Sequence, residues 1–144
     1  IAKLKVLKCL MQKKEAAIIN ISSALVFHPK INAAVYSATK SGLHHFTQAL
    51  RIQLNNTSIK VFEVLPPLTD TPLTQSNPYK KITVEHLVKV FASAFENNQT
   101  TILIGKTKWV YWLSRISPRL LKRIMTKRYM SQKFLKTKLA KDDV

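Results

Sequence analysis

The sequence predicts an α/β fold, a parallel β-sheet with helices packed against it, followed by basic amphipathic helices. Two short segments, residues 16–21 and 59–65, have the nearly continuous apolar character of strands buried on both faces of a parallel sheet. Between them, residues 33–55 contain few helix breakers and carry apolar residues at helical spacing. Strand, helix and strand in this order predict a right-handed βαβ unit with parallel strands.

The flanking segments fit the same fold. Residues 1–14 place leucines at helical spacing and are predicted to be the end of a helix. Residues 22–32, which contain Pro29, are predicted to form a loop. Four prolines between residues 66 and 78 indicate a second loop of irregular backbone.

The next elements are a helix and a short strand. Thr83 is a favourable N-cap for a helix over residues 84–97. Its core-facing residues are predicted to be Leu87, Val90, Phe91 and Phe95. Residues 100–104 are predicted to form a third strand, which Gly105 ends.

Charge divides the chain into two regions, 1–105 and 106–144. The first holds 12 basic and 5 acidic residues, and the second holds 12 basic and 2 acidic residues. The second region is predicted to form two or three amphipathic helices, one ending near Ile116 and the next starting at Ser117-Pro118. Its positive field favours anionic partners such as phosphates, acidic lipid surfaces or nucleic acid, although lysines on a solvated helix face are the plainer explanation.

Composition excludes several classes of protein. At 144 residues the chain is one domain or part of one. One cysteine, Cys9, excludes a disulfide framework, and we expect it to be a small buried residue. With a single cysteine the cytoplasm is the expected compartment, and no apolar run approaches the ~20 residues needed to span a bilayer. The two glycines, Gly42 and Gly105, cannot form a Gly-rich phosphate loop.

A candidate catalytic set lies between the first strand and the long helix. Tyr36 and Lys40 are four residues apart and therefore share one helix face. An ammonium beside a phenol stabilises the phenolate, and such a tyrosine can exchange a proton with an alcohol or carbonyl oxygen. Ser23, at the end of the strand, offers a hydroxyl to the same oxygen. The Tyr-x-x-x-Lys spacing alone is weak, because it recurs at Tyr129 in the basic tail.

The context of these residues resembles a known family. Residues 20–23 are Asn-Ile-Ser-Ser, and residues 36–40, Tyr-Ser-Ala-Thr-Lys, begin thirteen positions after Ser23. Residues 64–71, Val-Leu-Pro-Pro-Leu-Thr-Asp-Thr, follow the second strand. This series resembles the short-chain dehydrogenase/reductase family over residues 1–105. Its Pro-Pro-x-x-Asp-Thr form is similar to a subgroup of predicted oxidoreductases named after teichoic-acid D-alanylation gene clusters.

The resemblance implies the C-terminal part of a Rossmann-like, doubly wound parallel sheet and an NAD(P)-dependent oxidoreductase that acts on an alcohol or carbonyl. It implies that Ser23 polarises the substrate carbonyl, with Ser22 as the weaker alternative. Tyr36 would be the general acid/base, and Lys40 would tune it and hold the nicotinamide ribose. The backbone of Pro66, Pro67 and Leu68 would contact the nicotinamide, and Thr71 its carboxamide.

The family pattern is only partly present. Its Gly-rich dinucleotide loop and the residue that selects NAD or NADP have no counterpart in this sequence. We therefore expect a C-terminal half of such an enzyme, inactive by itself, with an open sheet edge and an uncovered sheet face. Full-length members form homo-oligomers through helices equivalent to residues 1–14 and 33–55.

Region 106–144 has two further interpretations. Its apolar stripe contains Trp109, Trp112, Leu113, Ile116, Leu120, Leu121, Ile124 and Met125. The stripe is expected to close over the substrate pocket or a partner subunit. The alternative is contact with an anionic membrane surface, which makes the chain a non-catalytic module on a degenerate fold. Nucleic acid is disfavoured, because no reading module is recognisable.

Overall fold

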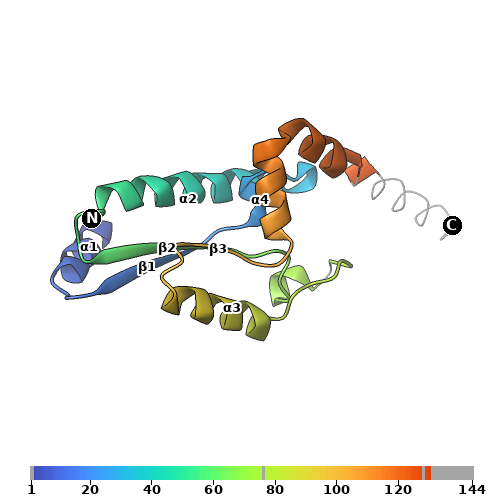
Figure 1. The fold of residues 1–144 in the computed structure, drawn as a ribbon. Helices are drawn as coiled ribbons and strands as arrows, with labels where there is room; N and C mark the ends of the chain where they lie inside the picture. Colours follow the sequence, from blue (N-terminus) through green and yellow to red (C-terminus); the bar gives the residue numbers. More distant parts are fainter. Residues whose placement is uncertain (1, 76, 128, 131–144) are drawn as a thin grey trace.

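The computed structural model describes residues 2–75, 77–127 and 129–130. Figure 1 shows a sheet of parallel strands with helices on both faces. The main elements in chain order are α1 (Ala2–Met11), β1 (Ala16–Ile21), α2 (Ala34–Gln53), β2 (Ile59–Leu65), α3 (Val84–Glu96), β3 (Thr101–Leu103) and α4 (Thr107–Ile116). Three 3-10 turns lie in the loops: η1 (Ala24–Val26), η2 (Ile31–Ala33) and η3 (Pro72–Thr74).

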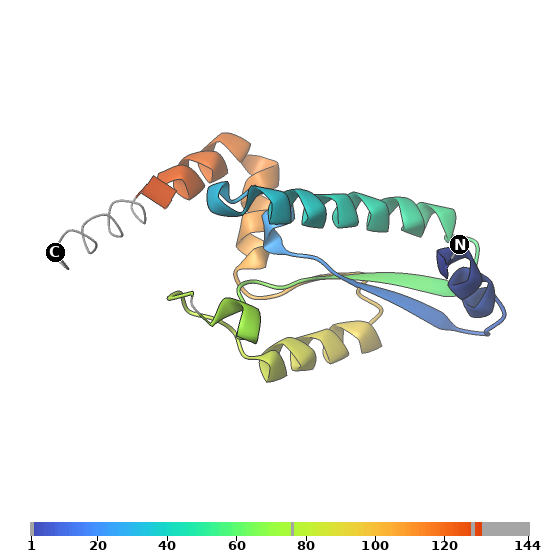
Figure 2. The ribbon, with the colours of Figure 1, turned by 180° about the vertical axis from the view of Figure 1, so that it is seen from behind.

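The three strands lie in the order β1-β2-β3, and both strand pairs are parallel. The predicted α/β class is therefore confirmed. One register row joins Asn20 of β1, Glu63 of β2 and Thr101 of β3. Figures 1 and 2 show α2 along one face of this sheet and α3 along the other.

Side-chain alternation along β2 divides the core between the two faces. Phe62 and Val64 pack with Ala94 of α3, and Leu87, Val90 and Phe91 of α3 pack against this cluster. On the other face, Ile59 and Val61 pack with Leu50 and Leu54, at the C-terminal end of α2. β2 is therefore covered on both sides, as predicted for a central parallel strand.

β1 differs from the prediction that it is buried on both faces. Its burial alternates along the strand, and Ile19 and Ile21 are 44% and 57% exposed. The reason is that α3 packs over β2 and β3, so that no described element covers the second face of β1. The expected open edge and uncovered face are both present at this strand.

Cys9 is exposed, so its expected burial is wrong. α1 packs toward the sheet through Leu7 and Leu10, which contact the cluster around Ile59 and Val61. In a helix, Cys9 lies on a different face from these two leucines and therefore faces away from the sheet.

The start of α3 confirms the predicted N-cap. The Thr83 hydroxyl oxygen accepts a hydrogen bond from the His86 N–H at 3.1 Å. Replacing Thr83 by alanine leaves that N–H without its partner and should lower the free energy of unfolding by about 1 kcal/mol. Chemical denaturation measures the loss, and Thr83→Ser should restore most of it. An unchanged midpoint for Thr83→Ala would show that the cap contributes nothing.

After β3 the chain turns sharply into α4. Gly105 has a φ of +56°, in the left-handed region that glycine adopts without strain. α4 follows at once and ends at Ile116, as predicted, and a second helix covers residues 118–127. Within the described residues, no helix is both long and apolar enough to cross a membrane.

Candidate active site

The candidate site lies where the parallel strands β1 and β2 end. The Ser22 N–H donates to the Val64 carbonyl at 2.8 Å, and the Ala24 N–H donates to the Pro66 carbonyl at 3.4 Å. These two bonds extend the strand pairing into the loops. They hold the segment around Ser23 beside the Pro66-Pro67 segment, so two parts of the predicted site are neighbours.

Ser23 caps η1 and is almost buried. Its backbone is extended, and its side-chain oxygen accepts a hydrogen bond from the Leu25 N–H at 3.3 Å. This contact uses a lone pair and leaves the hydroxyl proton for another acceptor. Ser23 can therefore donate to a carbonyl oxygen without giving up the contact that orients it.

The first turn of α2, which carries Tyr36, is fixed by a serine. The Ser37 hydroxyl donates to the Ala33 carbonyl at 2.9 Å and accepts from the Lys30 N–H at 3.1 Å. Ser37 is buried, whereas Ala33 supplies no side-chain cap to the helix. The serine therefore ties the preceding loop to the helix one residue from Tyr36.

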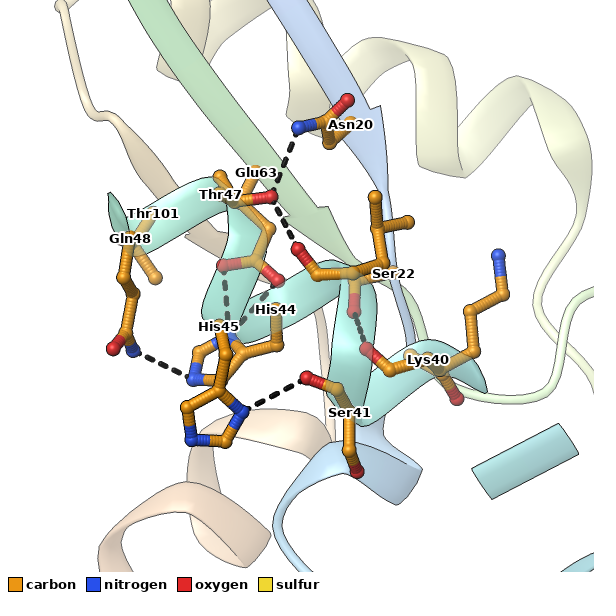
Figure 3. A network of polar contacts seen from close by, with 12 residues as sticks. Asn20, Ser22, Lys40, Ser41, His44, His45, Thr47, Gln48, Glu63 and Thr101 are labelled. Carbon is orange, nitrogen blue, oxygen red and sulfur yellow. Dashed lines mark hydrogen bonds and ion pairs between the residues drawn. The ribbon is translucent and has the colours of Figure 1, made fainter. Parts of the chain in front are cut away.

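Lys40 lies between the end of β1 and the ring of Tyr36. Its Nζ donates to the Ile21 carbonyl at 2.8 Å and lies 5.8 Å from the centre of the Tyr36 ring. The Ser22 hydroxyl donates in turn to the Lys40 carbonyl at 3.5 Å (Figure 3). Since an ammonium has three N–H donors, two remain for a ligand. Tyr36 is 42% exposed, so its ring is accessible from solvent.

The loop after β2 is built on threonines and a backbone bridge. The Ile82 N–H donates to the Leu68 carbonyl at 3.0 Å, and the Asp70 N–H donates to the Ile82 carbonyl at 2.8 Å. Thr71 and Thr74 form a reciprocal cap, with their hydroxyl oxygens 3.2 Å apart. The Thr74 hydroxyl also lies 2.6 Å from the Thr69 carbonyl, which can take its proton. Thr71 then donates to Thr74 and keeps acceptor capacity of its own.

A row of polar side chains lies beneath α2, at the register that joins the three strands (Figure 3). Each strand residue of this row meets a polar residue of α2. The pairs are Asn20 Nδ2 with Thr47 Oγ1 at 2.9 Å, Glu63 with His44 at 2.9 Å, and Thr101 Oγ1 with Arg51 Nη1 at 3.0 Å. The helix that carries Tyr36 and Lys40 is thus joined to all three strands by side-chain hydrogen bonds.

Glu63 is the most unusual member of this row, because its carboxylate is fully buried. His44 Nδ1 lies 2.9 Å from both carboxylate oxygens, and the amide nitrogen of Gln48 lies 2.8 Å from His44 Nε2. A carboxylate accepts and an amide N–H donates, so this arrangement fits a neutral imidazole with its proton on Nδ1. Neither Glu63 nor His44 is predicted from the sequence as a member of the site. A glutamate inside the apolar strand Ile59–Leu65 was the available signal.

Arg51 links α2 to the backbone of two strands. Its Nε donates to the Val61 carbonyl at 2.9 Å, and its Nη2 donates to the Thr100 carbonyl. Burial lowers the pKa of the Arg51 guanidinium below its ordinary value, and the charge of Glu63 opposes that shift. The guanidinium therefore satisfies carbonyls at the sheet surface and contributes positive charge near the buried carboxylate.

A surface hollow lies between α3, β3 and α4, and its lining includes Val90, Ile102 and Trp112. None of Ser23, Tyr36 and Lys40 lines it. This hollow is therefore separate from the candidate catalytic residues.

Residues 2–82 match the sequence profile described as short chain dehydrogenase, which is more than half of the chain. The chain belongs to the short-chain dehydrogenase family. It is 38% identical over 99 residues to an uncharacterized oxidoreductase, DltE, of Bacillus subtilis. The match covers 65% of this chain and 39% of that protein. An uncharacterized oxidoreductase of Staphylococcus epidermidis is 35% identical over 81 residues, which cover 54% of this chain and 35% of that protein.

Solved structures of this family share the fold. A short-chain dehydrogenase from Burkholderia cenocepacia, in complex with NADP, superposes with a TM-score of 0.77 at 23% identity over 85% of this chain and 52% of its own. A short-chain dehydrogenase from Sphingobium yanoikuyae, in complex with NADPH, gives 0.64 at 26% identity over 74% and 45%. The chain thus spans about half or less of these relatives, and the predicted family and Rossmann-like fold are confirmed.

Proposed function

We propose that this chain carries the proton-transfer residues of an NAD(P)-dependent oxidoreductase that interconverts an alcohol and a carbonyl compound. The observation that carries the proposal is the position of Lys40, whose ammonium is held at the end of β1 beside the Tyr36 ring. Ser23 follows the same strand end with a hydroxyl proton to donate. Family membership and relatives that are oxidoreductases support the reaction class.

Ser23, Tyr36 and Lys40 each have a separate role in the proposed reaction. In the reducing direction, Ser23 donates a hydrogen bond to the substrate carbonyl and so stabilises negative charge on its oxygen. Tyr36 gives its hydroxyl proton to the same oxygen as the alcohol forms. The Lys40 ammonium stabilises the phenolate that remains. In the oxidising direction the phenolate takes the proton back.

The residues present fit a nicotinamide cofactor. When bound, the nicotinamide supplies or accepts the hydride. Lys40 has two free N–H donors for ribose hydroxyls, and the backbone of Pro66, Pro67 and Leu68 would contact the nicotinamide ring. Thr71 keeps acceptor capacity for the amide of the carboxamide group. These proposed contacts lie on the nicotinamide end of the cofactor, which NAD and NADP share.

The proposal is tested with the polypeptide of the complete reading frame that contains residues 1–144. Purified protein is mixed with NADH or NADPH and a panel of ketones and aldehydes, and loss of the reduced nicotinamide absorbance is followed. Substrate-dependent oxidation that obeys saturation kinetics is the expected result. If neither cofactor binds in a calorimetric titration and no carbonyl compound is reduced, the proposal is wrong.

A pair of serine variants distinguishes the two neighbouring hydroxyls. Ser23→Ala removes the proposed donor to the developing oxyanion and should lower kcat by about 10²- to 10³-fold in the active protein. Ser22→Ala removes only the bond to the Lys40 carbonyl and should change kcat by less than about tenfold. Steady-state kinetics on both variants decide the assignment. The reverse order would give the substrate-binding role to Ser22.

A further inference from the structure

The apolar stripe of the C-terminal region faces solvent in α4. Trp109, Trp112 and Ile116 are 79%, 59% and 78% exposed. Their spacing of three and four residues places them on one face of the helix. The opposite face packs inward, with Thr107 buried and Tyr111 against Phe27 at 5.3 Å between ring centres. Trp109 and Ile116 face solvent, whereas the partly exposed Trp112 also lines the hollow between α3, β3 and α4.

Cations surround this face. Lys108 and Arg115, seven residues apart on α4, form a row beside the stripe, and both are exposed. In the next helix, Leu121 is buried, which fixes that helix on the protein, and its other face carries Arg119, Lys122, Arg123 and Lys127. The sequence contains no acidic residue between Glu96 and Asp142.

A cation of the second helix affects a histidine in the loop before α2. Burial lowers the pKa of His28 below its ordinary value, and the positive charge of Lys122 lowers it further. Lys122 is itself an exposed residue of helix 118–127. Its remaining cations, Arg119, Arg123 and Lys127, are exposed.

We propose that α4 and helix 118–127 form a docking surface for an anionic lipid bilayer, on which the protein lies without crossing it. This docking surface comprises Trp109, Trp112 and Ile116 of α4 together with the exposed cations beside them. Tryptophan prefers the boundary between lipid headgroups and acyl chains, and cations beside it attract acidic headgroups. Arg119, Arg123 and Lys127, which share one exposed helix face, can donate hydrogen bonds to headgroup phosphates. The proposal is independent of the catalytic function proposed above.

The experiment uses the 144-residue chain and vesicles of phosphatidylcholine, either alone or with one part in four of phosphatidylglycerol. Trp109 and Trp112 are the two tryptophans of the chain, so the intrinsic tryptophan emission reports on this surface alone. At about 50 mM salt, anionic vesicles should shift the emission to the blue and cosediment the protein at least about tenfold more strongly than neutral vesicles. At about 500 mM salt this preference should largely disappear.

Two sets of variants test which residues are responsible. The triple variant Arg119→Gln, Arg123→Gln and Lys127→Gln should bind anionic vesicles on the order of 100-fold more weakly. Its control is Lys13→Gln, Lys14→Gln and Lys80→Gln, three exposed lysines elsewhere, which should bind as the parent chain does. Circular dichroism confirms that each variant is folded.

The apolar part has its own matched pair. Trp109→Ser with Trp112→Ser should reduce cosedimentation at least about tenfold. Val35→Ser with Ile52→Ser removes apolar side chains that are 79% exposed on α2 and should change nothing. The proposal is wrong if the chain does not bind anionic vesicles at low salt, or if test and control variants lose binding equally. It is also wrong if lipid-free ultracentrifugation shows a dimer in which a second copy of the chain shields the tryptophans. Binding to DNA without binding to vesicles would equally overturn it.

Discussion

Tyr36→Phe should lower kcat by about 10²- to 10⁴-fold in the protein of the complete reading frame, while the affinity for the reduced cofactor stays within about threefold. Phenylalanine keeps the ring that packs near Lys40 but lacks the hydroxyl that carries the proton. The ring is 42% exposed, so its replacement should not disturb folding. Steady-state kinetics and a fluorescence titration of the cofactor measure the two effects separately.

The chain provides its own control for this substitution. Tyr129 also begins a Tyr-x-x-x-Lys match, but no strand-borne serine precedes it. Tyr129→Phe should leave both kcat and cofactor affinity unchanged. A full loss of activity in Tyr129→Phe, or full activity in Tyr36→Phe, would remove Tyr36 from the proton-transfer role.

His44→Leu should lower the free energy of unfolding by about 3–5 kcal/mol, the largest stability effect expected in this chain. His44 is the hydrogen-bond partner of the fully buried Glu63 carboxylate among the described residues. Removing it leaves a buried charge whose desolvation is no longer offset by hydrogen bonds. Urea denaturation followed by far-ultraviolet circular dichroism measures the change.

A double variant separates loss of the pair from loss of one partner. When both His44 and Glu63 are replaced by leucine, no buried charge remains unpaired, so the double variant should be more stable than His44→Leu alone. Gln48→Ala removes only an exposed contact to His44 and should cost less than about 0.5 kcal/mol. If the double variant is the least stable of all, the hydrogen-bonded Glu63–His44 pair is itself the stabilising element.

Much of the fold was predictable, because the apolar periodicity that identifies strands and helices lies within short segments of the sequence. The strands Ala16–Ile21 and Ile59–Leu65 have the predicted limits, and α3 has the predicted N-cap at Thr83. The two wrong predictions, the burial of β1 on both faces and the burial of Cys9, depend on how separate elements pack together. Whether the second face of β1 is covered depends on where α3 packs, and the side on which Cys9 lies depends on which face of α1 meets the sheet.

The candidate site shows the same division. Ser23, Tyr36 and Lys40 could be chosen from sequence because their spacing is fixed by one strand, one loop and one helix, and their roles stay predictions. The Glu63–His44 pair joins residues 19 positions apart on separate elements, so no local period signals it. Substrate identity depends on loop side chains that follow no common chemical pattern.

The polar row beneath α2 also determines the position of that helix along the strand direction of the sheet. A slip of one turn, about 5.4 Å, would place Lys40 or Gln48 opposite Glu63. The same slip would place the apolar Leu43 or the large Arg51 opposite Asn20. An all-apolar interface would tolerate such a slip far better, because leucine packs against leucine in many alignments. The row thus discriminates between alternative alignments of one helix, and through that choice it sets how far Tyr36 stands from the end of β1.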